Sequence, residues 1–236
     1  MGKRAIIIQA RMSSNRLPGK CLKLIGNEPL IFFVIERLRA LKLPIIIATS
    51  TDHSDDVLVD YLKSLDNILI FRGSLENVLD RYISAASKFD VNEILRITAD
   101  NPFVDVEAIE NSSSLFKEYN YLDGIYNDGW IKGTGFEFVL LNELKGIKAT
   151  SPDHLEHVTL SLREQMDNFP QFGQLEIPSY QKENSSIRLT CDYAKDFELI
   201  SNILKIFEYA TSVKVRDIIK LAEIQPEIFT INTGLN

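Results

Sequence analysis

Apolar and polar positions alternate in regular blocks along the first two thirds of the chain. Short runs rich in Ile, Leu and Val predict buried strands, at Ala5–Gln9, Pro44–Ser50, Ile68–Phe71 and Glu93–Thr98. The segments that follow them carry apolar residues at helical spacing and predict helices, at Pro29–Leu41, Asp55–Ser64, Leu75–Phe89 and Val106–Tyr119. Because strands that alternate with helices pair in parallel, the pattern predicts an α/β fold with a parallel sheet between helices.

The pattern becomes less regular after Tyr121. Shorter apolar runs predict further strands, at Leu122–Tyr126, Glu137–Leu141, Phe172–Ile177 and Ser186–Leu189. Helical spacing returns in three segments, at Asp153–Met166, Lys195–Tyr209 and Val215–Glu223. The chain shows no repeat, low-complexity tract or linker, so we expect one domain over residues 1–236.

Composition narrows the function classes only slightly. Hydrophobic residues make up 45% of the chain and the net charge is -7, which supports a sizeable core and disfavours binding to a nucleic-acid backbone. A few local Arg and Lys side chains can still neutralise a triphosphate. Cys21 and Cys191 lack metal-ligand spacing and are expected to be buried, reduced thiols. The apolar run Ala5–Ile8 is too short for a signal peptide or a membrane span, so we expect a cytoplasmic protein that does not engage a membrane.

Ligands of open α/β sheets bind where parallel strands end at their carboxyl side. Polar residues follow four of the expected strands, in Gln9–Lys20, Thr49–Asp52, Arg72–Ser74 and Thr98–Asn101. We therefore expect these four loops to share one cleft.

The first of these loops reads QARMSSNRLPGK and contains the cations Arg11, Arg16 and Lys20. A loop between a strand and a helix can offer backbone N–H groups and positive charge to a polyphosphate. The loop lacks the spacing of a P-loop and of a dinucleotide-binding turn. On charge alone, an exposed basic loop without a specific ligand remains an alternative.

The order of residues in this loop closely resembles the signature of the cytidylyltransferase family that includes CMP-acylneuraminate and CMP-Kdo synthetases. The branch called spore coat polysaccharide biosynthesis protein F is the nearest in pattern. Four further segments carry the resemblance, in order along the chain: Phe71–Ser74 with Asn77–Tyr82, Arg96–Pro102, Glu156–Thr159 and Arg188–Asp196. The last reads RLTCDYAKD, against a family pattern close to RLTVDTPED.

The resemblance implies a three-layer, Rossmann-like nucleotide-sugar-transferase fold with a mostly parallel mixed sheet. It also implies that CTP lies under the first loop and that an acceptor oxygen attacks the α-phosphorus and releases pyrophosphate. Arg11 and Lys20 would act in catalysis by stabilising charge on the leaving pyrophosphate. Arg16 is equally consistent with a phosphate contact and with a solvated side chain. The expected nucleotide contacts are Gln9, Ala10, Arg11, Met12, Ser13, Arg16, Lys20, Arg72, Ser74 and Asp100.

Two aspartates are expected to bind Mg²⁺, an ion that prefers hard oxygen ligands. From position alone, Asp100 before Pro102 suits a helix cap or turn, and Asp192 suits a cap for the helix that follows it. The resemblance favours the metal for both. For the base, Arg72 suits a contact with the cytosine or ribose, or an ion pair with a carboxylate such as Asp80.

The acceptor is expected to meet residues from three parts of the chain, namely Asn101, Glu137, Glu156 and His157. Gly135 stands where the family pattern has an aspartate, which predicts an acceptor different from those of the relatives. Trp130 is expected either to shape this pocket or to pack in the core or an oligomer contact.

The sequence therefore predicts an Mg²⁺-dependent enzyme that transfers CMP from CTP to a sugar-like, acidic acceptor in the synthesis of surface polysaccharide or glycan precursors. Whether the product is CMP-linked or CDP-linked stays open, because both use attack on the α-phosphate. A glycosyltransferase of the same fold and a non-catalytic nucleotide-binding module are the alternatives. A homodimer is expected by analogy only.

Overall fold

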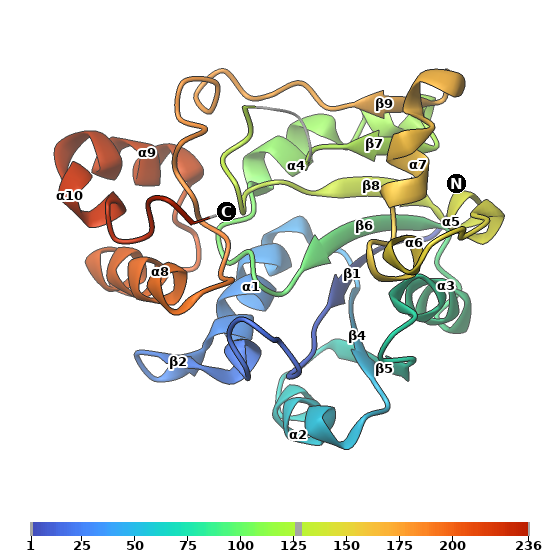
Figure 1. Cartoon of the computed structure of the whole chain (residues 1–236), viewed down its shortest axis with the longest axis horizontal. Helices are drawn as coiled ribbons and strands as arrows, with labels where there is room; N and C mark the ends of the chain where they lie inside the picture. The colour runs from blue at the N-terminus through green and yellow to red at the C-terminus, as the bar shows by residue number, and fades with distance from the viewer. Residues whose placement is uncertain (1, 126–128, 236) are drawn as a thin grey trace.

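The computed structural model describes residues 2–125 and 129–235. Its strands are β1 (Arg4–Gln9), β4 (Ile45–Ser50), β5 (Ile68–Gly73), β6 (Glu93–Thr98), β7 (Tyr121–Asp123), β8 (Glu137–Leu140) and β9 (Phe172–Gln174), beside a small hairpin of β2 (Leu24–Ile25) and β3 (Glu28–Pro29). The seven strands form one sheet in the order β5-β4-β1-β6-β8-β7-β9 (Figure 1). β5, β4, β1 and β6 are parallel, and β8 joins β6 antiparallel. The expected mixed, mostly parallel sheet is confirmed.

β1 is the central strand of the parallel part because both of its faces are apolar. Ile8 is fully buried and lies opposite Ile47 of β4 and Ile97 of β6. The chain runs outward from β1 through β4 to β5 and then returns to β6 on the other side of β1. This reversal creates a topological switch point between β1 and β6, where ligands of open α/β sheets bind.

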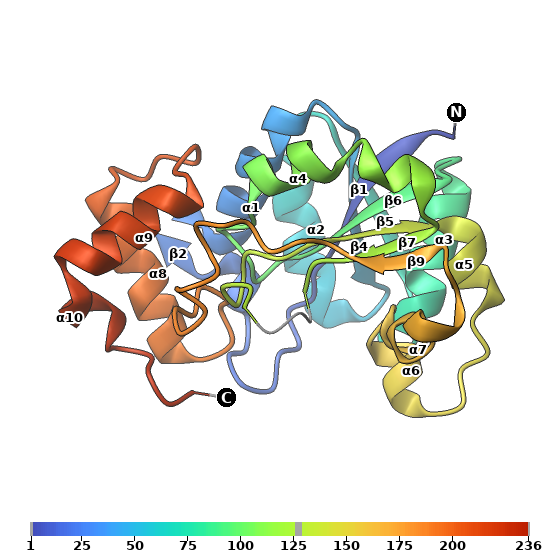
Figure 2. The ribbon, with the colours of Figure 1, turned by 90° about the horizontal axis from the view of Figure 1, so that it is seen from above.

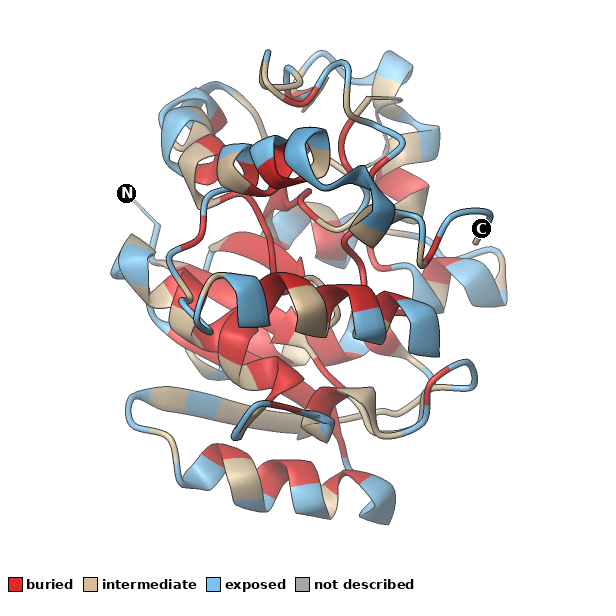
Figure 3. Cartoon of the chain, turned by 90° about the vertical axis from the view of Figure 1, so that its left-hand side faces the viewer, coloured by how far each residue is buried: buried red, intermediate tan, exposed pale blue. Residues whose placement is uncertain are grey.

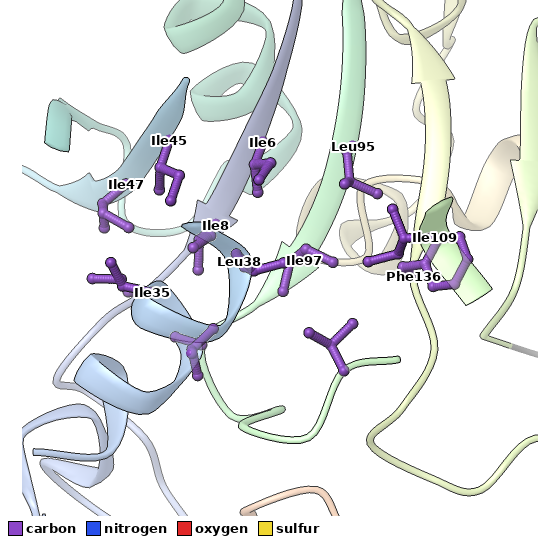
Figure 4. Packing of buried hydrophobic residues seen from close by; sticks show 14 of the residues in the cluster. Ile6, Ile8, Ile35, Leu38, Ile45, Ile47, Leu95, Ile97, Ile109 and Phe136 are labelled. Carbon is purple, nitrogen blue, oxygen red and sulfur yellow. The ribbon is translucent and has the colours of Figure 1, made fainter. Parts of the chain in front are cut away.

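Helices cover both faces of the sheet, so the fold has the three expected layers (Figure 2). One face is covered by α1 (Leu30–Leu38), α2 (Asp56–Lys63) and α4 (Val106–Ser112), and the other by α3 (Val78–Lys88), α5 (Leu141–Gly146), α6 (Pro152–Glu156) and α7 (Leu160–Glu164). Successive residues of a strand point to opposite faces. Ile8 accordingly packs with Ile35 and Leu38 of α1 (Figure 4), whereas Ile7 packs with Tyr82 of α3.

The last three helices pack on the far side of α1. They are α8 (Ala194–Ile206), α9 (Val215–Ile224) and α10 (Pro226–Phe229). Leu30 and Phe33 of α1 share a buried cluster with Leu199 and Ile203 of α8 and with Ile218 of α9. Buried and exposed positions alternate along the helices that face the viewer in Figure 3, as amphipathic helices require. This lobe positions the segment before α8 over the switch point.

Four expected elements differ most from the structure. The helix expected over Val106–Tyr119 ends at Ser112 as α4, and a separate 3-10 helix follows at Leu115–Glu118. The helix expected over Asp153–Met166 is divided into α6 and α7, because the backbone at His157 is not helical (φ -98, ψ 78). The strand expected at Ser186–Leu189 contributes only an isolated bridge between Lys132 and Arg188. The strand expected at Leu122–Tyr126 is β7, and Tyr126 itself lies outside the described residues.

Within residues 2–125 and 129–235, every helix is too short or too polar to cross a membrane.

Candidate active site

A cavity of about 520 Å³ opens at the carboxyl ends of β1 and β6, at the switch point of the sheet. Its size falls within the range usual for small-molecule sites. Ten residues expected from the sequence to form the site line this cavity: Gln9, Ala10, Arg11, Arg16, Lys20, Asp100, Asn101, Glu156, His157 and Asp192. Of the four strand-end loops expected to share one cleft, Gln9–Lys20 and Thr98–Asn101 meet here, whereas Thr49–Asp52 and Arg72–Ser74 do not line the cavity.

The loop after β1 is held in shape by a buried carboxylate that the sequence did not single out. Asp55 is fully buried and accepts hydrogen bonds from the Met12 backbone N–H (2.7 Å) and the Thr49 hydroxyl (2.9 Å). Gly19 adopts a left-handed conformation (φ 70) directly before the 3-10 turn Lys20–Leu22. Because side chains other than glycine rarely adopt that φ, this turn fixes the direction in which Lys20 leaves the backbone.

Lys20 lies between the two expected metal ligands. Its Nζ is 2.7 Å from Asp100 Oδ2 and 3.3 Å from Asp192 Oδ1, and it donates to the Cys191 carbonyl at 2.9 Å. Burial alone would lower the pKa of Lys20, but Asp100 outweighs it and the pKa is raised. Burial alone would raise the pKa of Asp100, but Lys20 holds it below its usual value. Both groups are therefore charged at neutral pH.

Other residues cap the neighbouring helices. Asp196 accepts from the backbone N–H groups of Asp192 and Tyr193 (both 2.9 Å) at the start of α8, and Asp105 caps α4. Asp192 instead forms ion pairs with Arg16 (2.8 Å) and Arg188 (2.9 Å), besides Lys20. The capping role considered for Asp100 and Asp192 thus falls to Asp105 and Asp196, and both carboxylates are available to the cavity.

Arg11 and Glu156 face each other across the mouth of the cavity. Arg11 Nη2 lies 3.0 Å from Glu156 Oε1, and the two side chains are 35% and 52% exposed. Such exposed pairs contribute about 0–1 kcal/mol, so a ligand can replace either partner at small cost. His157 follows Glu156 in the break between α6 and α7, and it also lines the cavity.

Three basic residues that the sequence analysis did not select also line the cavity, namely Arg81, Arg96 and Lys132. Arg81 of α3 donates to the carbonyls of Ser74 (2.6 Å) and Leu75 (3.3 Å), while its buried Nε has no hydrogen-bond partner among the described residues. Burial lowers the pKa of Arg81, and the charges of Tyr82 and Asp55 offset this effect only in part. Arg81 is therefore a buried cation that an anionic ligand in the cavity would stabilise.

Glu137 lies behind the cavity wall instead of lining it. It is fully buried, forms an ion pair with Arg96, and accepts from the hydroxyls of Tyr121 and Thr159 (both 2.6 Å). Arg96 in turn donates to Gln9 Oε1 (3.2 Å) at the end of β1. The structure therefore does not bring Glu137 to an acceptor, but links it to the cavity through Arg96.

Four expected nucleotide contacts do not line the cavity: Met12, Ser13, Arg72 and Ser74. Arg72 is held by Asp56 (2.7 Å) and by the carbonyls of Ser50 and Asp52, so it pairs with a carboxylate other than Asp80. Ser74 accepts from the Asn77 backbone N–H (2.9 Å) in the turn before α3. In the first loop, Ser14 and Asn15 line the cavity where Met12 and Ser13 were expected to do so.

Packing explains why residue 135 is a glycine where the family pattern has an aspartate. A Cβ atom at this position would lie 2.3 Å from the Gly124 carbonyl oxygen and 3.1 Å from the Ile125 Cα. The backbone before the undescribed residues thus fills the space that an aspartate would need, and Ile125 lines the cavity there. Trp130 is buried against Phe136 with ring centroids 5.8 Å apart, which places it in the core.

The switch point between β1 and β6, with a basic loop on one side and two aspartates on the other, defines an α/β protein with a site for a phosphate-rich ligand. Comparison with known proteins then gives the family. The family model described as cytidylyltransferase matches residues 5–218, so this chain belongs to the cytidylyltransferase family and is an enzyme of that class.

Individual relatives agree with this assignment. The chain is 32% identical to spore coat polysaccharide biosynthesis protein SpsF of Bacillus subtilis over 95% of each chain. It is 32% identical to 3-deoxy-manno-octulosonate cytidylyltransferase 2 of Hydrogenovibrio crunogenus, over 66% of this chain and 60% of that protein. The structure of a cytidylyltransferase from Leptospira borgpetersenii covers 100% of both chains with a TM-score of 0.91 at 26% identity. The resemblance seen in the sequence is confirmed.

Proposed function

We propose that this enzyme transfers CMP from CTP to a sugar-like acceptor and releases pyrophosphate, in the synthesis of a surface polysaccharide or glycan precursor. One observation carries the proposal: Lys20 of the first loop contacts both Asp100 and Asp192, which lie 80 and 172 residues away along the chain. A loop suited to a triphosphate and two carboxylates suited to a divalent cation thus share one cavity. The family relationship supports this function over a glycosyltransferase and over a non-catalytic module.

The triphosphate is assigned to the basic side of the cavity. Arg11 and Lys20 would contact the β- and γ-phosphates, where negative charge accumulates as the α–β phosphoanhydride bond breaks. Arg81 adds a third cation whose buried Nε has no hydrogen-bond partner among the described residues. Fixed cations in a partly buried site stabilise the leaving pyrophosphate more strongly than water does, because they need no reorientation.

The residues present fit an Mg²⁺ ion held jointly with the nucleotide. The described residues contain no group of three or more His, Cys, Asp or Glu side chains arranged for a metal. Mg²⁺ usually binds through one or two carboxylates together with substrate phosphates and water, and Asp100 and Asp192 supply such a pair. When bound, the ion would neutralise charge on the α-phosphate as the acceptor oxygen approaches.

The acceptor is assigned to the side of the cavity formed by Asn101, Glu156 and His157. Its hydroxyl oxygen forms the new bond to the α-phosphorus while the α–β bond breaks, and the hydroxyl proton is released. Lys132 also lines this cavity and forms no ion pair among the described residues, so it can accommodate an acidic group of the acceptor. The name of one relative refers to an octulosonate, which supports an acidic sugar, and the name of another refers to a spore coat polysaccharide, which supports a polysaccharide precursor.

The test is pyrophosphate release from each of the four nucleoside triphosphates with Mg²⁺ and a panel of sugar acids, sugar phosphates and polyols. We expect release with CTP and an acidic sugar, and a loss of at least about 100-fold in turnover in Lys20→Ala, since one electrostatic contact to a developing charge contributes about 10²–10³ in rate. Lys23→Ala is the matched control, because Lys23 is exposed and lies over the Phe197 ring outside the cavity. Absence of CTP binding by calorimetry, together with no pyrophosphate from any acceptor, would refute the proposal.

A further inference from the structure

Each cation of the first loop is already paired with a carboxylate of the protein. Arg11 is paired with Glu156 and Arg16 with Asp192, through one contact each. Lys20 differs, because its ammonium group bridges two carboxylates, at 2.7 Å from Asp100 and 3.3 Å from Asp192. These are the two carboxylates assigned to Mg²⁺, so the same oxygens have two competing cationic partners.

We infer that Lys20 sets the order in which nucleotide and metal enter the site, by closing the aspartate pair to divalent cations until a triphosphate draws its ammonium group away. The inference rests on the proposed function. Mg²⁺ binds carboxylate oxygens at about 2.0–2.1 Å, so an ion on the Lys20-facing oxygens would lie directly against the ammonium group. Two cations at that separation repel each other, and one of them must leave.

The geometry of the remaining contacts allows this exchange without loss of the site. Lys20 contacts Oδ2 of Asp100, whereas Oδ1 of the same carboxylate accepts from the Thr98 hydroxyl at 2.5 Å. Lys20 and Arg16 contact Oδ1 of Asp192, whereas Oδ2 is held by Arg188 at 2.9 Å. Departure of Lys20 thus frees Oδ2 of Asp100, and Oδ1 of Asp192 is freed when Arg16 leaves with it, while both carboxylates stay oriented.

The cations differ in how readily they can move. Arg188 also binds Asp196 through two nitrogens and is buried, so it stays in place. The Lys20 ammonium is a point charge on a flexible stem, and it can follow a phosphate oxygen by rotation of that stem. Arg16, which shares Oδ1 of Asp192 and lies over the Tyr193 ring, is 52% exposed at its side chain, so little burial opposes its movement. A triphosphate can therefore take over both loop cations together.

This role predicts effects of opposite sign on the two ligands. Removing the charge of Lys20 should raise the affinity of the nucleotide-free protein for a divalent cation and lower its affinity for CTP. A purely structural role would lower both affinities, because a distorted site binds neither ligand well.

The test is a Mn²⁺ titration of the nucleotide-free full-length protein, followed by electron paramagnetic resonance. We expect Lys20→Met to bind Mn²⁺ about tenfold or more tightly than the wild type, a factor typical of coupling between two sites. Lys23→Met removes the same charge away from the carboxylates and should leave the affinity unchanged. The gain should disappear in Lys20→Met/Asp100→Asn, and thermal melts check that each variant is folded.

Unchanged or weaker Mn²⁺ binding in Lys20→Met would overturn the inference, as would a gain that persists in the double variant. If Lys20→Met does not fold, Lys20→Gln serves in the same titration with the same expectation. The nucleotide-free wild type provides a second test. If it binds Mn²⁺ as tightly as Lys20→Met or Lys20→Gln does, and Asp100→Asn abolishes that binding, then Lys20 does not close the site.

Failure of the inference and failure of the proposed function give different results. If Lys20→Met gains no Mn²⁺ affinity while the wild type releases pyrophosphate from CTP, the function stands and the binding order is wrong. If the wild type neither binds CTP nor releases pyrophosphate while Lys20→Met gains Mn²⁺ affinity, the lysine closes a metal site that serves another reaction.

Discussion

The ion pair between Arg96 and Glu137 connects the core to the cavity. Glu137→Gln tests how much this ion pair contributes to the stability of the protein. The substitution keeps the shape of the side chain and can retain the hydrogen bonds from Tyr121 and Thr159. It removes the charge opposite Arg96, whose side chain is 8% exposed and whose other partner is the neutral amide oxygen of Gln9. The variant is therefore left with a buried, uncompensated guanidinium.

Breaking a buried ion pair in this way costs about 3–5 kcal/mol. That is a large share of the stability of a typical protein, about 5–15 kcal/mol. For a chain of this length, about 2–4 °C of melting temperature correspond to each kcal/mol, so the melting temperature should fall by about 6–20 °C. Denaturant unfolding and calorimetry measure both quantities.

Glu156→Gln is the matched control, because it removes the same charge from an exposed pair with Arg11 and should cost about 0–1 kcal/mol. Arg96→Met added to Glu137→Gln should recover part of the loss, since the uncompensated charge is then gone. Equal losses in Glu137→Gln and Glu156→Gln, or no recovery in the double variant, would show that the charge of Glu137 is not what stabilises this part of the core.

Two further predictions concern other charged residues. Arg81→Ala should weaken CTP binding by about tenfold or more, as expected for loss of a charge-assisted hydrogen bond. Arg72→Ala should change CTP binding little, because Arg72 is held by Asp56 outside the cavity. Calorimetry with CTP and UTP compares the two variants, and a larger loss in Arg72→Ala than in Arg81→Ala would restore the base contact first assigned to Arg72. Burial would raise the pKa of Asp196, but Arg188 and Asn232 outweigh this effect and the pKa is lowered. The contribution of Asp196 to stability is therefore present above its unfolded-state pKa of about 3.9 and is lost as the pH falls through its folded-state pKa. The free energy of unfolding, measured with denaturant between pH 2 and 5, roughly the window around that value, should therefore fall less steeply with falling pH in Asp196→Asn than in the wild type. Identical slopes in the two proteins would contradict this role of Asp196.

Three strands of the parallel part, β1, β4 and β6, could be predicted because they are buried on both faces. β6 has the expected bounds, Glu93–Thr98, and β1 and β4 differ from expectation by one residue at their first ends. After Tyr121 the strands are shorter and lie toward the edge of the sheet, where tertiary packing decides their limits. The break between α6 and α7 was not predictable from spacing, because the apolar positions continue through it; Thr159, directly after the break, donates to the buried Glu137.

Membership of a motif did not by itself decide which residues reach the cavity. The first loop and both aspartates reach the cavity, whereas Arg72 and Ser74 bind the backbone and side chains next to them. The sequence does contain a signal for Arg81 that the sequence analysis did not use. Arg81 lies on the buried stripe of α3 with Val78 and Tyr82, and a charged residue at such a position requires a polar partner or a ligand.

The distribution of charge explains how an acidic chain can hold a triphosphate. The net charge is -7, yet among the described residues six basic and three acidic side chains line the cavity. Charges beyond about 8–10 Å are largely screened at physiological salt, so this local excess outweighs the acidic remainder of the surface for a ligand at the switch point. The loop cations are paired with carboxylates of the protein. Under the proposed binding order a triphosphate would replace these partners, so the cations would keep an anionic partner, and the carboxylates released would lie where the nucleotide brings its metal ion.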